Sequence, residues 1–193
     1  KMIKFALPFD LPEVRVLCEI PYGVAERAAD ATEHSSVRWV RLDGRDCTVG
    51  VANNGAPGFH AYADGELGLS ISRGAVYSCG DENPRLDPNR AYTFMDQETI
   101  DTRFRLVAGA DREDTARALV LAALELNHPL EHFFAYHVPT LPADAPAHPA
   151  PFLAVEPSNV IVSALKKADR DEALIVRLHE TANAIRGIGG LAA

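Results

Sequence analysis

The side chains with the clearest chemical potential gather in one long segment, residues 74–99. About 25 residues without helix or strand periodicity are uncommon in a compact domain unless they contact something. Guanidinium groups can donate hydrogen bonds to sugar hydroxyls, and aromatic faces can pack on sugar rings. In and beside the segment stand Arg73, Arg85, Arg90, Tyr77, Tyr92, Phe94 and Gln97. Two interpretations remain open, a carbohydrate contact and packing against a neighbouring domain.

The same segment also carries carboxylates, and a pair of them flanking a glycosidic bond is what glycoside hydrolysis requires. Closeness in sequence does not establish that geometry. In a chain with 27 acidic residues, a solvated acidic loop is the better interpretation. The carboxylates in question are Asp81, Glu82, Asp87, Asp96 and Glu98.

Two further patterns do not support a metal site or a catalytic nucleophile. His128, His132 and His137 surround Glu131, but their spacing matches no zinc motif and crosses an expected helix end, so we expect surface histidines and no metal site. Ser163-x-x-Lys166 resembles the string that puts a nucleophile one helical turn from a lysine. Here it lies in a β-branched run, where residues three apart point to opposite faces.

The composition limits the classes of partner. A formal net charge of -8 would repel nucleic-acid phosphates. No apolar run approaches the roughly 20 residues of a membrane span, and we find no signal sequence. Cys18, Cys47 and Cys79 are irregularly spaced, which favours a cytoplasmic protein without disulfides or a zinc knot. Because Lys1 is not a natural start and the end is glycine-rich, we expect a piece of a longer chain.

The elements that would position these residues are mainly strands. Beyond the first strand, around residues 14–20, strands are expected at 37–42, 48–52, 59–62, 67–72 and 102–107, separated by turn formers. In the last of these, Phe104 and Leu106 should face the core. The first strand shows period-two alternation, with one face formed by Val14, Val16, Cys18 and Ile20 and the other by Arg15 and Glu19.

One amphipathic helix interrupts the strands. Asp111 is suited to cap its start, and Pro129 requires it to end near Asn127. Its apolar positions recur with helical spacing at Ala116, Leu119, Val120, Ala123 and Leu124.

The C-terminal third begins with a proline-rich connector, residues 139–151, which holds five of the 13 prolines. Strands are expected after it at 152–155, 160–165 and 174–178. Two groups of strands with one helix predict a mainly β fold, a large antiparallel β-sandwich. The expected organisation is main sheets and helix in residues 1–138, the connector, and C-terminal strands in residues 152–193.

Several motifs, in order along the chain, resemble the C-terminal region of class II α-mannosidases, glycoside hydrolase family 38. The most specific is the two-strand unit of residues 160–167 and 174–178, which is similar to a characteristic unit of that family. The others are the segments at residues 18–23, 49–55, 69–73, 92–97, 126–130 and 152–159.

The resemblance implies a galactose-mutarotase-like supersandwich that completes a zinc-dependent retaining α-mannosidase acting on terminal α-D-mannose. In that family the zinc, its ligands and the nucleophilic Asp belong to an N-terminal catalytic domain, so this chain would hold no catalytic residue and no metal. Its partners would be that domain and mannose-containing carbohydrate, and a homo-oligomer stays open.

The resemblance also implies that an arginine from this region reaches the sugar site. Arg90 is the best positional match, with Asp96 and Gln97 next, and all three are expected to bind substrate. Two alternatives stay open: an independent mannoside-binding module and a purely structural interaction domain.

Overall fold

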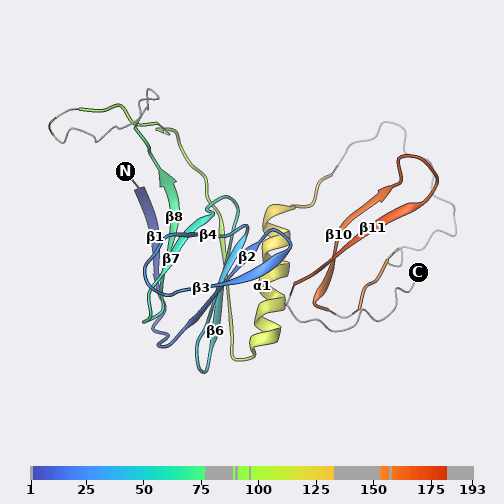
Figure 1. Ribbon diagram of the computed structural model, residues 1–193, viewed down its shortest axis with the longest axis horizontal. Coiled ribbons are helices and arrows are strands. Elements are labelled where there is room, and N and C mark those ends of the chain that lie inside the picture. The colour runs from blue at the N-terminus through green and yellow to red at the C-terminus, as the bar shows by residue number, and fades with distance from the viewer. Residues whose placement is uncertain are drawn as a thin grey trace. The chain divides into compact units, whose positions relative to one another are not determined.

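The computed structural model describes residues 2–76, 89, 91–95, 97–132, 153–156 and 158–181. The chain divides into two compact units. The first comprises Lys1–Pro21 and Ala25–Asn127, and the second comprises Tyr22–Val24 and His128–Ala193. The elements of each unit can be followed in Figure 1.

Two antiparallel sheets form most of the first unit. The four-stranded sheet has the order β1-β8-β7-β4, and the five-stranded sheet has the order β3-β2-β5-β6-β9. The strands are β1 (Met2–Pro8), β2 (Arg15–Ile20), β3 (Gly23–Arg27), β4 (His34–Ser35), β5 (Trp39–Asp43), β6 (Thr48–Asn53), β7 (Gly58–Ala61), β8 (Glu66–Arg73) and β9 (Phe104–Gly109).

The core lies between these two sheets, because both contribute fully buried apolar side chains to one cluster. The five-stranded sheet supplies Val16, Cys18, Val40, Leu42 and Val51, and the four-stranded sheet supplies Phe59, Ala61, Leu67 and Leu69. Sheets packed face to face in this way form a β-sandwich. The predicted mainly β fold with one helix is therefore confirmed.

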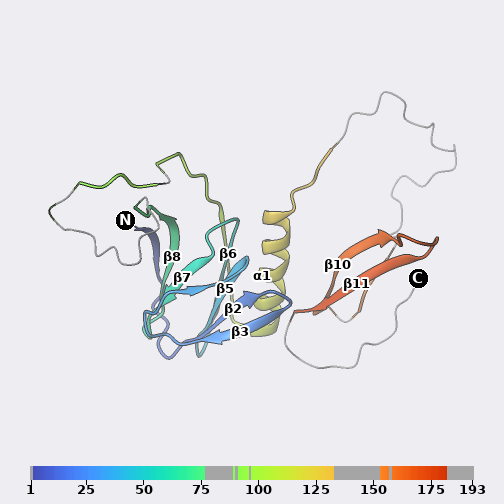
Figure 2. The same ribbon diagram turned by 45° about the horizontal axis from the view of Figure 1, so that its top comes forward.

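Helix α1 (Arg112–Asn127) covers the other face of the five-stranded sheet, as Figure 2 shows beside β5 and β6. Asp111 caps its start, since Asp111 Oδ1 accepts a hydrogen bond from the Asp114 amide at 2.8 Å. Leu119 is fully buried and lies above Gly50 of β6, where a Cβ would come within 2.5 Å of it. The predicted start, end and buried face of the helix are confirmed.

In the second unit, β10 (Val160–Lys167) and β11 (Leu174–Glu180) form an antiparallel hairpin with a register shift between Val162 and Ala164. These are two of the three predicted C-terminal strands. The third, expected at 152–155, is not a named strand over its described part, where Ala154 alone forms a β-bridge. Residue 152 and the connector at 139–151 lie outside the described residues.

Two side chains lie on the predicted faces of their strands but differ from expectation in exposure. Glu19, expected on the polar face of β2, is only 5% exposed because Arg38 pairs with it. Leu106, expected in the core, is 59% exposed because β9 is an edge strand. The short strands β3 and β4 and the first strand, β1, were not predicted. None of the helices in the described part of the chain has the length and apolarity that crossing a membrane requires.

Candidate functional site

The base of the 74–99 segment is held closed by its own backbone. Val76 and Phe94 form an isolated antiparallel bridge, and the Met95 amide donates to the Ala75 carbonyl at 2.8 Å. Gly74 lies close to the returning arm, since a Cβ there would be 3.2 Å from the Met95 carbonyl oxygen. The segment therefore leaves the end of β8 as a loop with paired arms.

The three residues expected to bind substrate belong to this loop. Gln97 is exposed, and its Nε2 donates to the Met95 carbonyl at 3.0 Å, which braces the returning arm. Arg90 and Asp96 lie outside the described residues, so the substrate-binding role of the set stays a prediction. Cys79, His137 and the carboxylates at 81, 82 and 87 also lie outside them.

A polar cluster that the sequence analysis did not identify lies on the outer face of the four-stranded sheet. It consists of Lys4, Glu33, His60 and Ser70, named here the outer-face cluster. Lys4 pairs with Ser70 across β1 and β8, and its Nζ forms an ion pair with Glu33 and lies 2.8 Å from His60 Nδ1. The Ser70 hydroxyl donates to Glu33 Oε1. Four residues far apart in sequence thus share one network.

The protonation of the cluster follows from these contacts. The Lys4 ammonium can only donate, so His60 Nδ1 accepts and the ring proton resides on Nε2. Burial and the neighbouring Lys4 charge lower the pKa of His60, which keeps the imidazole neutral. Burial raises the pKa of Glu33, but hydrogen bonds from Lys4 and Ser70 outweigh it and the net pKa is lowered. The cluster therefore holds an ammonium, a carboxylate and a neutral imidazole.

Two glycines make room for this network. A Cβ at Gly68 would overlap the His60 ring, and a Cβ at Gly58 would lie 2.8 Å from Glu33 Oε1. The alternation Gly58-x-His60 and Gly68-x-Ser70 is the only sequence signal that could have pointed to the cluster.

The cluster has the groups for hydrogen bonding but not the arrangement for nucleophilic catalysis. Among the described residues, the only base on the Ser70 hydroxyl is the Glu33 carboxylate, whose lowered pKa makes it a weak one, and His60 Nδ1 faces Lys4 and not the hydroxyl. Nor do His, Cys, Asp and Glu side chains in the described ranges form any group of three or more that could hold a metal ion.

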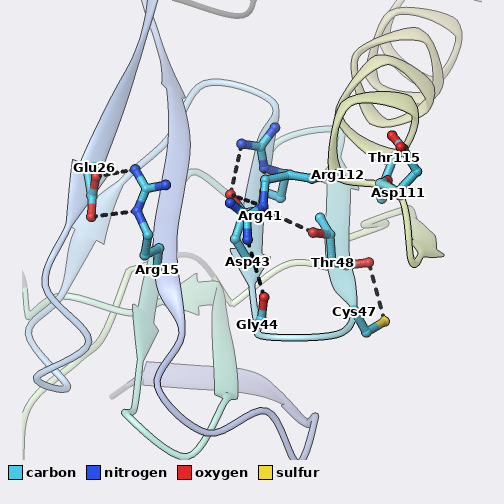
Figure 3. Close-up of polar contacts among 10 residues, drawn as sticks. All are labelled: Arg15, Glu26, Arg41, Asp43, Gly44, Cys47, Thr48, Asp111, Arg112 and Thr115. Carbon is cyan, nitrogen blue, oxygen red and sulfur yellow. Dashed lines mark hydrogen bonds and ion pairs between the residues drawn. The ribbon is translucent and has the colours of Figure 1, made fainter.

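A second polar network, drawn in Figure 3, surrounds the buried carboxylate of Asp43 at the end of β5. Arg41 Nε lies 2.9 Å from Asp43 Oδ1, Arg112 Nε lies 3.6 Å from Oδ2, and the Thr48 hydroxyl donates to Oδ1 at 3.3 Å. All of its partners come from β5, β6 and the start of α1. We interpret this network as a structural joint, since Thr48 and Arg112 link β6 and α1 to Asp43 of β5.

The first unit is a β-sandwich, and comparison with known proteins shows which family it resembles. Residues 1–87 match the family model described as "Glycosyl hydrolases family 38 C-terminal domain". Over residues 1–87 the chain is therefore similar to the C-terminal domain of glycosyl hydrolase family 38, and the resemblance drawn from its motifs is confirmed. No curated protein matches the chain.

Two solved structures from Enterococcus faecalis share the fold. One is described as a protein in glycosyl hydrolase family 38, with a TM-score of 0.66 and 18% identity. The other is described as an alpha-mannosidase from strain V583, with a TM-score of 0.66 and 17% identity. Each match covers 92% of this chain and 20% of the solved chain, so the chain spans about a fifth of the length of these proteins.

Proposed function

We propose that these 193 residues are an accessory domain of a longer, zinc-dependent retaining α-mannosidase that releases terminal α-D-mannose. The observation that carries this proposal is the match of residues 1–87 to the family 38 C-terminal domain. The length of the similar solved chains supports it, because four fifths of each lies outside the matched region. One of those chains is described as an alpha-mannosidase.

The contacts of the buried carboxylates also support an accessory role. Retaining hydrolysis needs one carboxylate as nucleophile and another as acid/base catalyst, both within reach of the sugar. The two buried acids of the sandwich are bound by arginines instead, Glu19 by Arg38 and Asp43 by Arg41. The Glu19–Arg38 pair joins β2 to the residue before β5, the Asp43–Arg41 pair lies within β5, and the carboxylate oxygens of both pairs are occupied by protein groups.

In this proposal the nucleophile, the acid/base catalyst and the zinc come from a catalytic domain outside the 193 residues. The described residues do not fit a zinc ion, so no step is assigned to zinc within this chain. The partners are that domain and mannose-containing carbohydrate, and the location is the cytoplasm. The accessory domain stabilises the catalytic domain and contributes the 74–99 loop to sugar recognition.

The test compares two preparations on an aryl α-mannoside. One is the 193-residue chain, with its folding verified by circular dichroism, and the other is the longer polypeptide that contains it. We expect turnover by the longer polypeptide only. Turnover by the 193-residue chain, or none by the longer polypeptide, contradicts the proposal. Saturable binding of mannose oligosaccharides to the 193-residue chain, measured by calorimetry, would instead indicate an independent binding module.

A further inference from the structure

One side of the sandwich is formed by two edge strands, β1 of the four-stranded sheet and β9 of the five-stranded sheet. An aromatic pair joins the two strands. Phe5 of β1 stacks on Phe104 of β9, with ring centroids 5.3 Å apart and planes 15° from parallel. This pair is the bridge between the sheets on that side, which we name the open side, and it defines the boundary of the core there.

Apolar side chains on the open side remain in solvent. Leu106 pairs with Val51 across β9 and β6, and paired residues share a face, so Leu106 lies on the inner face beside a core residue. It is nevertheless 59% exposed. On β1, Ile3 is 62% exposed and Phe5 is 41% exposed. An inner-face leucine left uncovered indicates that the four-stranded sheet ends before the five-stranded sheet does.

This arrangement is costly for an isolated domain. Strands at sheet edges present unpaired backbone groups, and natural proteins cover such edges or mark them with charge. β1 and β9 are seven and six residues long, and although Lys4 and Arg105 place charge on them, they also leave Ile3 and Leu106 exposed. Ile3 and Leu106 each lie two residues along their strand from a member of the aromatic pair, so the exposed apolar side chains gather around that pair, which favours an interaction site.

The length of the similar proteins supports one partner, the rest of a longer chain. The matched solved chains are about five times as long as the region they share with this chain, so most of their polypeptide is available to cover it. We propose that the open side is where the remainder of the longer chain docks, through an apolar surface placed against Ile3, Phe5 and Leu106. This inference rests on the proposed function, because it requires that longer chain.

The test is thiol labelling of the native longer chain, with Leu106→Cys and a matched variant, Val37→Cys. Val37 is also exposed, at 44%, but it lies next to β4, the edge of the four-stranded sheet opposite β1. Each variant reacts with a maleimide, and mass spectrometry reports the labelling rate at that position, native and in urea. Dividing the rate in urea by the native rate removes intrinsic reactivity.

We expect the thiol at position 106 to be protected at least about tenfold more than the thiol at position 37. Equal protection overturns the proposal, because the two side chains would then be as exposed in the longer chain as they are in this domain. Protection that disappears on dilution also overturns it and indicates a second copy of the chain. Activity toward an aryl α-mannoside is measured on the same samples. An active chain with equal protection overturns only the docking proposal. An inactive chain with strong protection at position 106 overturns only the proposed mannosidase function.

Discussion

Asp43, the last residue of β5, lies 3.6 Å from Arg112, the first residue of α1, and the contact joins the carboxylate Oδ2 to the guanidinium Nε. The Asp43 side chain is fully buried, whereas the Arg112 side chain is 50% exposed. Arg41, at 13% exposure, shares the carboxylate from within the sheet. The buried acid thus fixes the start of the helix against the sheet that the helix covers.

The two partners should therefore contribute unequally to stability. Asp43→Ala leaves Arg41 buried without its counterion, and we expect a loss of about 3 kcal/mol in the free energy of unfolding. Arg112→Ala removes a half-exposed ion pair that water screens, and we expect a loss below about 1 kcal/mol. Urea denaturation monitored by circular dichroism measures both. Equal losses would show that burial does not increase the contribution of the Asp43 carboxylate to stability.

The contact between Gly50 and Leu119 makes a second prediction. A Cβ at position 50 would come within 2.5 Å of Leu119 Cδ2, so Gly50→Ala should lift the helix and cost about 1–3 kcal/mol. Leu119→Ala alone creates a cavity and should cost about 2–5 kcal/mol. In the double variant the new methyl enters that cavity, so the combined loss should be smaller than the sum. Additive losses in urea denaturation would contradict the proposed contact.

The sequence predicted the elements whose signals are local. The cap at Asp111, the helical spacing through Leu119 and the end at Asn127 are all set by neighbouring residues, and the alternating strands follow the same logic. β1 was not predicted because residues 2–8 lack clear alternation and end in a proline. Periodicity reports which residues share a face, and the structure confirms that for Phe104 and Leu106.

The candidate site depends on contacts that periodicity cannot report. Lys4 meets Glu33 and His60 across 29 and 56 residues of sequence, so only the sheet order brings them together. Glu19 is buried because it pairs with Arg38, which is 19 residues away in sequence but on the neighbouring segment in the fold. Leu106 is exposed because its strand is the last of the sheet. Each of these outcomes is decided by tertiary neighbours.

Two ion pairs of β2 allow a matched test of burial. Glu19 is 6% exposed and accepts from Arg38 Nε at 2.9 Å, whereas Arg15 and Glu26 are 53% and 54% exposed. Glu19→Gln removes the charge that a mostly buried arginine requires, and we expect a loss of about 2 kcal/mol in the free energy of unfolding. Glu26→Gln should leave stability unchanged within error, although Arg15 lowers the pKa of Glu26. Denaturation curves of the two variants, recorded side by side, decide the comparison.

The outer-face cluster should make stability depend on pH. Burial and the charge of Lys4 lower the pKa of His60 in the folded chain, so the unfolded chain binds the proton more readily. The contribution of His60 is fully present above the ordinary imidazole pKa of about 6.5 and is lost as the pH falls through the lowered value. Glu33 stays ionised in this window, since its pKa is also lowered.

His60→Gln tests this dependence, because glutamine can still accept from Lys4 but does not titrate. The free energy of unfolding of the wild-type chain should fall between about pH 7 and about pH 5.5, and that of the variant should fall less. Urea denaturation at several pH values measures both slopes. Parallel slopes would show that carboxylates elsewhere in the chain, and not His60, cause the dependence.

The expected substrate contact of Arg90 is tested in the longer chain. If its guanidinium donates to a sugar hydroxyl, Arg90→Ala should raise the KM for an aryl α-mannoside by about tenfold or more, which is the usual effect of losing a charged hydrogen bond. Arg45→Ala is the matched control, since Arg45 is an exposed arginine on the turn between β5 and β6, with 77% of its side chain in solvent. Gln97→Ala should act more weakly, because the Gln97 amide already donates to the Met95 carbonyl. If Arg90→Ala leaves both kcat and KM at the values of the Arg45 control, the loop has no contact with sugar and the domain acts through its protein contacts alone.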